Sequence, residues 1–100
     1  MELSQAMLFR LLLADIALQR GQSNVAVQSL LELSRETRDP RIAQRATEAA
    51  WNARFIGAAI EAAGIWLAAD PESQQARQVL AALLVNQARL ADAQIGRAHV

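Results

Sequence analysis

The sequence lacks cysteine and lysine, and its glycines and prolines are few and scattered. Without cysteine the chain forms no disulfide bond and carries no thiolate for catalysis or metal binding. The glycines Gly21, Gly57, Gly64 and Gly96 stand apart from one another, so no glycine-rich phosphate-binding loop is present. No stretch alternates β-branched and polar residues as a strand does. These absences favour an all-α protein without a phosphate loop or a reactive thiol.

The formal net charge is zero, because ten arginines balance ten acidic residues. No overall field therefore favours nucleic acid, an anionic membrane or an acidic substrate. The carboxylates Asp15, Glu32, Glu48 and Glu61 have no histidine or second acid at a spacing typical of catalysis or metal binding. We therefore expect no enzyme activity, no cofactor, no metal and no nucleic-acid partner.

The first segment, residues 3–19, is strongly apolar. Arg10 and Asp15 interrupt it, and no uninterrupted apolar run in it exceeds four residues. The pattern therefore fits neither a signal peptide nor a membrane-spanning helix. The compartment stays open: the cytoplasm is the default, and a periplasmic or membrane-anchored location would require an upstream signal.

Apolar residues make up 53% of the chain and recur at helical spacing. In residues 40–73 they form two consecutive stripes with a period of three to four residues, which predicts two amphipathic helices joined by a tight turn. The stripes are Ile42, Ala43, Ala46, Ala49, Ala50 and Ala53, then Ile56, Ala59, Ile60, Ala63 and Leu67. We expect Ala46 and Ala59 to lie where the two helices approach closely.

Pairs of aspartate and proline predict where two of the helices begin. Asp39 can cap a helix whose first residue is Pro40, a position at which the missing N–H does no harm. Asp70 and Pro71 repeat the pair, with Glu72 in the expected first turn. Both pairs therefore indicate a new helix.

The region before Asp39 reads as an earlier helical hairpin. Gly21 is a C-terminal signal for the first helix, and Ser23 or Asn24 can cap the second. The first helix carries apolar residues on two flanks, so we expect neighbours on two of its sides. These flanks are Ala6, Phe9, Leu13, Ile16 and Ala17, and Leu8, Leu11, Leu12 and Leu18.

After Pro71 a fifth helix carries Ala76, Val79, Leu80, Leu83 and Leu84. Its pattern weakens over residues 86–89, and a sixth helix is predicted to begin near residue 90. The expected architecture is therefore all-α, with five helices and a truncated sixth.

Three stretches of the chain repeat at a nearly constant interval. Ala26, Ala59 and Ala93 are 33 and 34 residues apart, and Leu13, Ala46 and Leu80 keep the same intervals. Small residues follow the second set, the prolines Pro40 and Pro71 lie near unit ends, and the pattern covers roughly residues 7–94. It resembles the tetratricopeptide repeat. The run LLLADIALQRG…ETRDPRIAQRATEAAW…ADPES…LAALL also resembles the beginning of larger bacterial repeat proteins of unassigned function.

The resemblance implies antiparallel hairpins stacked as a right-handed α-solenoid, with repeats at about residues 4–39, 40–73 and 74–94, the last one incomplete. In this family the first helices line a concave groove that binds a peptide or partner helix. The groove positions carried over to this chain are Arg41, Gln44, Glu48, Trp51, Asn52, Gln75, Gln78 and Asn86, together with Leu8, Leu11, Asp15, Leu18, Gln19 and Val85. Val79 and Ala82 occupy places where a clamp for a C-terminal carboxylate would need polar groups.

Three functions fit this pattern. The favoured one is a protein-interaction module with a scaffold or assembly role. The first alternative is a purely structural segment of a larger repeat array, and the second is an RNA-binding helical repeat, which the neutral charge disfavours. The fifth helix is also expected to leave an apolar edge open to self-association.

Two groups of residues have a structural explanation beside the functional one. The arginines Arg35, Arg38, Arg41 and Arg45 can hold an anion, but acidic residues three or four positions away can neutralise them. We expect Trp66 to be a packing residue. We assign Trp51 to the inner side of a first helix, where it can contact a ligand.

The last six residues, IGRAHV, can be written in codons as ATC GGA AGA GCA CAC GTC, which resembles a sequencing-library adapter read in frame. We therefore expect residues 95–100 not to be natural, and we assign no chemistry to the single histidine, His99.

Overall fold

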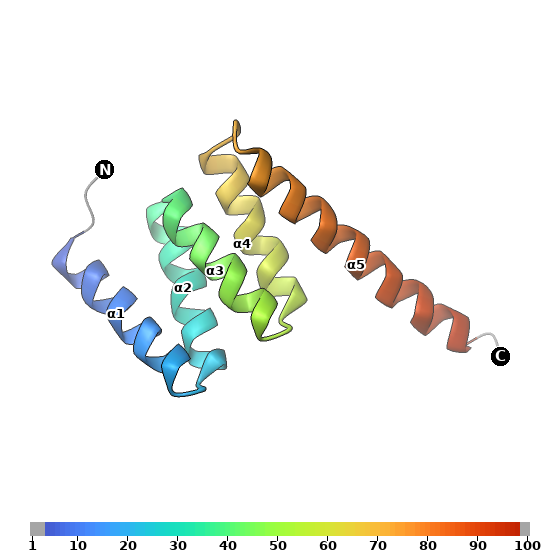
Figure 1. The fold of residues 1–100 in the computed structure, drawn as a ribbon, viewed down its shortest axis with the longest axis horizontal. Helices are drawn as coiled ribbons and strands as arrows, with labels where there is room; N and C mark the ends of the chain where they lie inside the picture. The colour runs from blue at the N-terminus through green and yellow to red at the C-terminus, as the bar shows by residue number, and fades with distance from the viewer. Residues whose placement is uncertain (1–3, 99–100) are drawn as a thin grey trace.

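The computed structural model describes residues 4–98, with side chains for residues 4–92. Its five helices are α1 (Gln5–Gln19), α2 (Ser23–Thr37), α3 (Pro40–Asn52), α4 (Ile56–Ala69) and α5 (Gln74–Ala98) (Figure 1). No strand occurs between residues 4 and 98, so the prediction of an all-α fold is confirmed.

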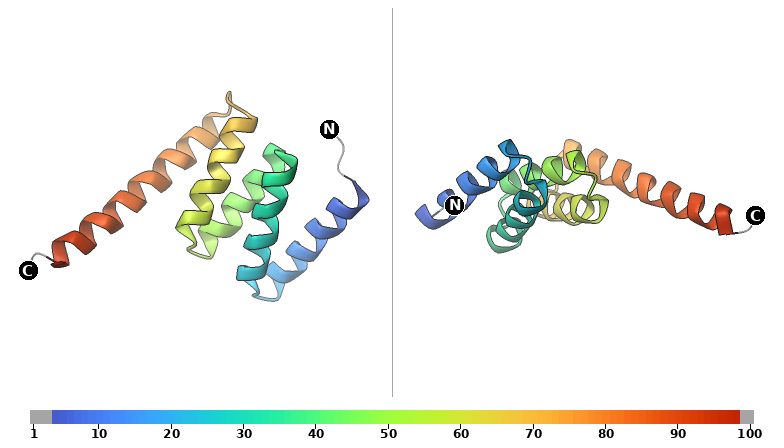
Figure 2. Two further views of the ribbon diagram at one scale, coloured as in Figure 1. Left: turned by 180° about the vertical axis from the view of Figure 1, so that it is seen from behind. Right: turned by 90° about the horizontal axis from the view of Figure 1, so that it is seen from below.

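Each helix packs against the next one in the chain, and α2 also packs against α4. The most extensive contact joins α3 to α4. In the right-hand view of Figure 2, α1, α3 and α5 lie on one side of the molecule, and α2 and α4 lie on the other. The helices that begin the two hairpins, α1 and α3, therefore lie on the same side as α5.

Small side chains fill the contact between α3 and α4. The two predicted stripes meet there, and their alanines are among the most deeply buried residues of the chain. On these two helices the alanines with no exposed surface are Ala43, Ala46 and Ala50 of α3 and Ala59, Ala62 and Ala63 of α4. Ala46 and Ala59 therefore lie inside the core, as predicted.

Larger side chains complete the core on either side of these alanines. Leu30, Leu33 and Ile42 are the largest fully buried side chains with only apolar atoms, and Trp66 is 4% exposed. The packing role predicted for Trp66 is confirmed. Three hydroxyls are also buried, and each donates to the backbone carbonyl four residues earlier, which removes the cost of burying it. The donors are Ser34, Thr37 and Thr47.

Two of the predicted helix ends are confirmed. Gly21 follows the end of α1 with a φ of 78°, a backbone conformation that glycine adopts without strain. At the start of α3, the Asp39 carboxylate accepts a hydrogen bond of 2.9 Å from the backbone N–H of Arg41, and Pro40 is the first helical residue.

Two other predicted helix starts are wrong. α2 begins at Ser23 with Gln22 at the cap position, so Ser23 and Asn24 lie inside the helix. α5 begins at Gln74, where the Ser73 hydroxyl accepts a 3.1 Å hydrogen bond from the Ala76 N–H. The aspartate-proline pair before it forms a turn that Ser73 N–H closes onto the Asp70 carbonyl, because proline also suits the second position of a turn.

The separate sixth helix is also not found, because α5 is continuous through residue 98. Residues 86–89 contain no glycine or proline, and a weakening apolar stripe does not by itself end a helix, since asparagine, glutamine and arginine tolerate helical backbone. Residues 95–98 belong to α5, whereas His99 and Val100 lie outside the described residues.

The expectation that α1 has neighbours on two sides holds only in part: among the described residues α1 packs extensively against α2, and its Asp15 forms an ion pair with Arg45 of α3. Ala14 and Ala17 are buried, whereas Phe9, Leu12, Leu13 and Ile16 are 37–60% exposed. We call these four residues the α1 outer face. Apolar residues on both flanks predict two packing contacts, and within the described residues α1 makes an extensive contact only with α2.

Replacing Ala59 by leucine is expected to destabilise the fold. The side chain has no exposed surface, so the added carbons overpack the hairpin and should lower the free energy of unfolding by about 1–3 kcal/mol. Thermal or urea unfolding followed by circular dichroism measures the change. Ala68→Leu, at an exposed position of α4, is the control, and equal stability of the two variants would contradict the packing described for Ala59.

Candidate functional site

An apolar cleft opens between α3 and α5, with α4 as its floor. Its volume is about 270 Å³. We call it the α3–α5 cleft, and it is lined by Thr47, Glu48, Trp51, Trp66, Gln75, Val79, Ala82 and Leu83. Most of this lining is apolar, and Glu48 contributes the only carboxylate among the lining residues.

The two tryptophans of the chain line this cleft from different helices. Trp66 is nearly buried, while Trp51 is 37% exposed. The Arg54 guanidinium carbon lies 5.4 Å from the centre of the Trp51 ring, which is a cation–π distance. Trp51 is therefore held by a cation and still presents apolar surface to the cleft.

Three of the predicted groove residues, Glu48, Trp51 and Gln75, line the α3–α5 cleft. Glu48 also lines a second hollow, between α3 and the first hairpin, together with Asn52. Gln44 lies one turn before Glu48 and donates to its carboxylate at 3.2 Å. Of the predicted positions on α3, Glu48, Trp51 and Asn52 thus line one or both hollows, and Gln44 contacts Glu48.

Leu18 of α1 also lines the second hollow. Of the other predicted positions, Asp15 pairs with Arg45, and none lines either hollow. Arg41 is beside the α2–α3 turn, paired with Asp39. Gln78 lies with Gln74, Arg77 and Ala81 on a different side of α5. Asn86 is half-buried and lies one helical turn beyond Ala82.

Five lining residues were not among the predicted groove positions: Thr47, Trp66, Val79, Ala82 and Leu83. The apolar stripe predicted for the fifth helix includes Val79 and Leu83. The pattern does not distinguish residues packed in the core from residues that line a cleft. The cleft lies between α3 and α5, which make no extensive contact with each other, and that geometry is not encoded in a periodicity.

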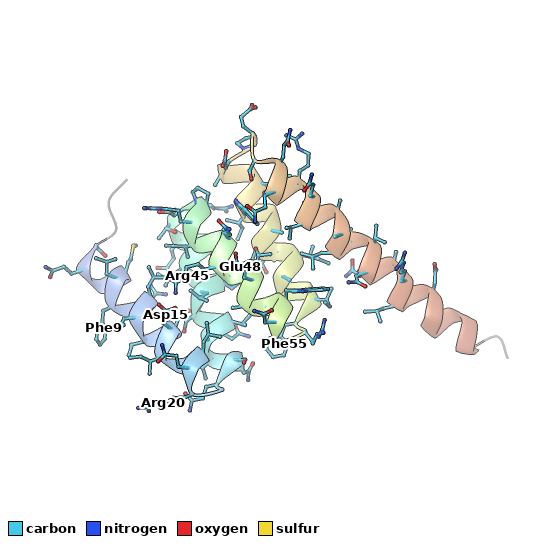
Figure 3. All side chains as sticks on the ribbon, viewed as in Figure 1. Phe9, Asp15, Arg20, Arg45, Glu48 and Phe55 are labelled. Atoms are coloured by element: carbon cyan, nitrogen blue, oxygen red, sulfur yellow. The ribbon has the colours of Figure 1, made fainter. Side chains whose placement is uncertain are left out.

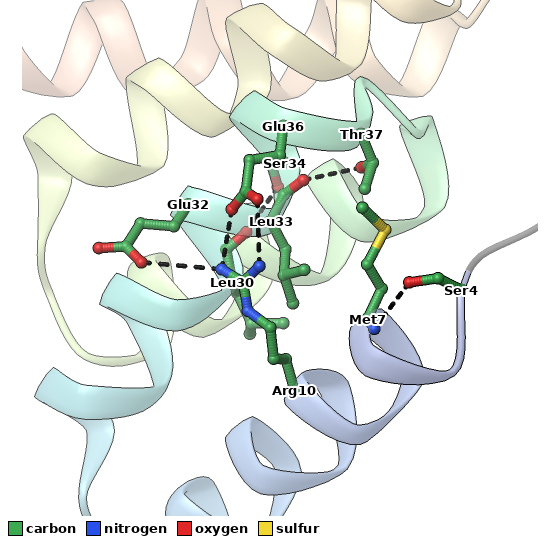
Figure 4. Close-up of polar contacts among 9 residues, drawn as sticks. All are labelled: Ser4, Met7, Arg10, Leu30, Glu32, Leu33, Ser34, Glu36 and Thr37. Carbon is green, nitrogen blue, oxygen red and sulfur yellow. Dashed lines mark hydrogen bonds and ion pairs between the residues drawn. The ribbon is translucent and has the colours of Figure 1, made fainter.

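Among the described residues, three arginines form four ion pairs with acids of other helices, and Arg10 pairs with both Glu36 and, at 3.8 Å, Glu32. Arg10 donates two hydrogen bonds to Glu36, of 3.1 and 2.8 Å, across α1 and α2 (Figure 4). Arg35 joins α2 to Glu61 of α4, with one hydrogen bond of 2.8 Å. Arg45 of α3 pairs with Asp15 of α1 (Figure 3).

These pairs decide between the two interpretations of the arginine cluster. Arg35, Arg41 and Arg45 are each bound to a carboxylate. Neutralisation is therefore the better explanation for these three. Only Arg41 uses the acid predicted from its neighbourhood in the sequence, whereas the other two use acids from other helices.

The ion pairs also shift the ionisation of their acids. The hydrogen bond from Arg35 lowers the pKa of Glu61, and that from Arg10 lowers the pKa of Glu36. The hydrogen bond from Arg41 likewise lowers the pKa of Asp39. Each arginine stabilises the charged form of its partner.

No protein-family model matches the chain, and no curated protein sequence matches it. The resemblance to the tetratricopeptide repeat therefore rests on the residues quoted above. In the part of the chain that the structure describes, no helix is both long and apolar enough to span a membrane.

The stability of the fold is expected to decrease in acid. A carboxyl group whose pKa is lowered by folding contributes stability that is complete above its unfolded pKa, roughly 4.3 for glutamate, and lost as the pH falls through its folded pKa. Melting temperatures between pH 7 and pH 2 should therefore fall below about pH 5. Glu61→Gln should melt lower than the parent at pH 7 and lose less on acidification. Glu72→Gln, in the exposed turn before α5, is the control, and an identical acid loss in Glu61→Gln and the parent would contradict this assignment.

Proposed function

We propose that the chain is a protein-interaction module whose hairpins stack as a tetratricopeptide-like α-solenoid, and that it acts in scaffolding or assembly rather than catalysis. Its ligand is a peptide or partner helix that lies along α3 and α5. The observation that carries the proposal is the α3–α5 cleft, because an open apolar hollow beside an exposed tryptophan fits an apolar side chain from another molecule.

The energetics of the cleft support a single anchoring side chain. Burying one leucine or phenylalanine side chain contributes about 1.5–3 kcal/mol. The polar lining residues Glu48 and Gln75, together with Asn52 nearby, offer hydrogen bonds to the ligand backbone. Binding would therefore combine one apolar anchor with several polar contacts.

Filling the cleft should abolish peptide binding. Ala82 is exposed and lines the cleft, whereas its neighbour Ala81 is equally exposed but lies outside it. A 12-residue random peptide library displayed on phage supplies ligands for the whole chain, and anisotropy of a labelled peptide measures affinity. Ala82→Phe should weaken binding at least tenfold, and Ala81→Phe should not change it. Equal affinities of the two variants would exclude the cleft as the peptide site.

The alternative of a structural segment within a larger repeat array is favoured by a different observation. The α1 outer face, Phe9, Leu12, Leu13 and Ile16, corresponds by the repeat interval to Ile42, Arg45, Ala46 and Ala49 on α3, and to Ala76, Val79, Leu80 and Leu83 on α5. Most of the corresponding residues are buried or half-buried, and those of α5 pack against the preceding helix, α4. The α1 outer face is thus an exposed version of a surface that two other helices bury.

If the α1 outer face is a packing surface, the chain alone should associate through it or through the open side of α5, where Leu84 and Val85 are about half exposed. Sedimentation velocity over a range of concentrations measures this association. Leu13→Glu combined with Leu84→Glu should shift the protein toward monomer. Val25→Glu, which charges a single exposed valine, is the control. A parent that is monomeric at all concentrations would contradict the prediction.

A further inference from the structure

Among the described side chains, Glu48 has no arginine partner, whereas the matching acid one repeat interval earlier has one. The repeat interval of 33 residues relates Asp15 of α1 to Glu48 of α3. Asp15 forms an ion pair with Arg45 of the next first helix. The residue that corresponds to Arg45 one interval of 34 later is Val79, on α5. The position that neutralises the first acid is therefore apolar at the second.

The contacts of Glu48 agree with this difference. One carboxylate oxygen accepts a hydrogen bond from the Gln44 amide at 3.2 Å. Among the described side chains, no arginine lies within ion-pair distance of Glu48. Figure 3 shows Glu48 farther along α3 than Arg45, which pairs with Asp15 of α1.

Glu48 also lies on the surface that the proposed ligand would contact. It lines both the α3–α5 cleft and the hollow beside the first hairpin. Val79, the apolar replacement, lines the same cleft. The loss of the arginine therefore leaves an apolar cleft with one uncompensated carboxylate among its lining residues.

A positive charge, opposite in sign to Glu48, also lies near the cleft and bears on which ligand charge the cleft favours. Arg54 is held against Trp51, so a cationic side chain of a ligand is repelled there and attracted to Glu48. An anionic ligand would be attracted to Arg54, but inside the cleft it would meet the Glu48 carboxylate, because Glu48 is a lining residue and Arg54 is not. Charge complementarity thus favours a ligand that is apolar and basic rather than apolar and acidic.

We propose that Glu48 makes the α3–α5 cleft selective for a peptide segment in which a large apolar residue lies within one helical turn of an arginine or lysine. The apolar side chain enters the cleft, and the cation pairs with Glu48. This inference rests on the proposed function, because it names the ligand chemistry of the same cleft.

The test is a parallel selection from the same 12-residue phage library against the whole parent chain, Glu48→Gln and Glu72→Gln. Peptides selected by the parent and by the Glu72→Gln control should be enriched in arginine or lysine close to a leucine or an aromatic residue. Peptides selected by Glu48→Gln should keep the apolar residue and lose the basic enrichment. Both variants change exposed side chains, and matching melting curves verify that they fold.

Affinity gives a second measurement on the same probes. A basic peptide recovered with the parent should bind Glu48→Gln about threefold more weakly, as expected for an exposed ion pair. The difference should shrink when the salt concentration is raised to 1 M.

The two proposals fail in different ways. Equal basic enrichment with the parent and Glu48→Gln would overturn the role of Glu48, while peptides that Ala82→Phe blocks would still support the cleft as a peptide site. Peptides that Ala82→Phe does not block, or a library that yields no binder, would overturn both. Basic peptides could also be selected because they promote association of two copies of the chain. Sedimentation would then show a change in oligomeric state when the peptide is added, and this result would also overturn the role of Glu48.

Discussion

Close packing of α3 against α4 is the constraint on which the rest of the structure depends. Alanines with no exposed surface face this contact from both helices, and side chains this small let helix backbones approach more closely than leucines would. The short turn at residues 53–55 then fixes the hairpin. Because little apolar area is available from alanine, the larger residues around it, Leu30, Ile42 and Trp66, supply most of the burial.

The register of this central hairpin determines where the polar groups fall. With α3 and α4 fixed, Arg35 of α2 reaches Glu61, and Arg45 reaches Asp15 of α1. These pairs are exposed and contribute little stability individually. Their greater effect is on the surface, because they occupy three of the four clustered arginines together with Arg41 and leave Glu48 with an amide as its only described hydrogen-bond partner.

Local chemistry made part of the fold predictable from the sequence. Gly21 and the pair Asp39–Pro40 end and begin helices because their backbone preferences act within a few residues. The pair Asp70–Pro71 misled the prediction because a turn and a helix start share the same preferences, and Ser73 decided between them. The continuity of α5 was missed because a fading apolar stripe reports the loss of a packing partner rather than the end of hydrogen bonding.

The candidate site was less predictable, for a reason that lies in the geometry of α5. Periodicity identifies the side of a helix that is apolar. It does not specify how far apart two helices lie, and the cleft lies between α3 and α5, which make no extensive contact, with Trp66 of α4 among its lining residues. The sequence shows that Arg45 is followed 34 residues later by Val79, but the consequence of this difference depends on whether Val79 lies in a tight contact or in an open cleft. A valine at a tight contact would only fill space, whereas a valine at an open cleft removes a cation from the rim and leaves apolar surface in its place.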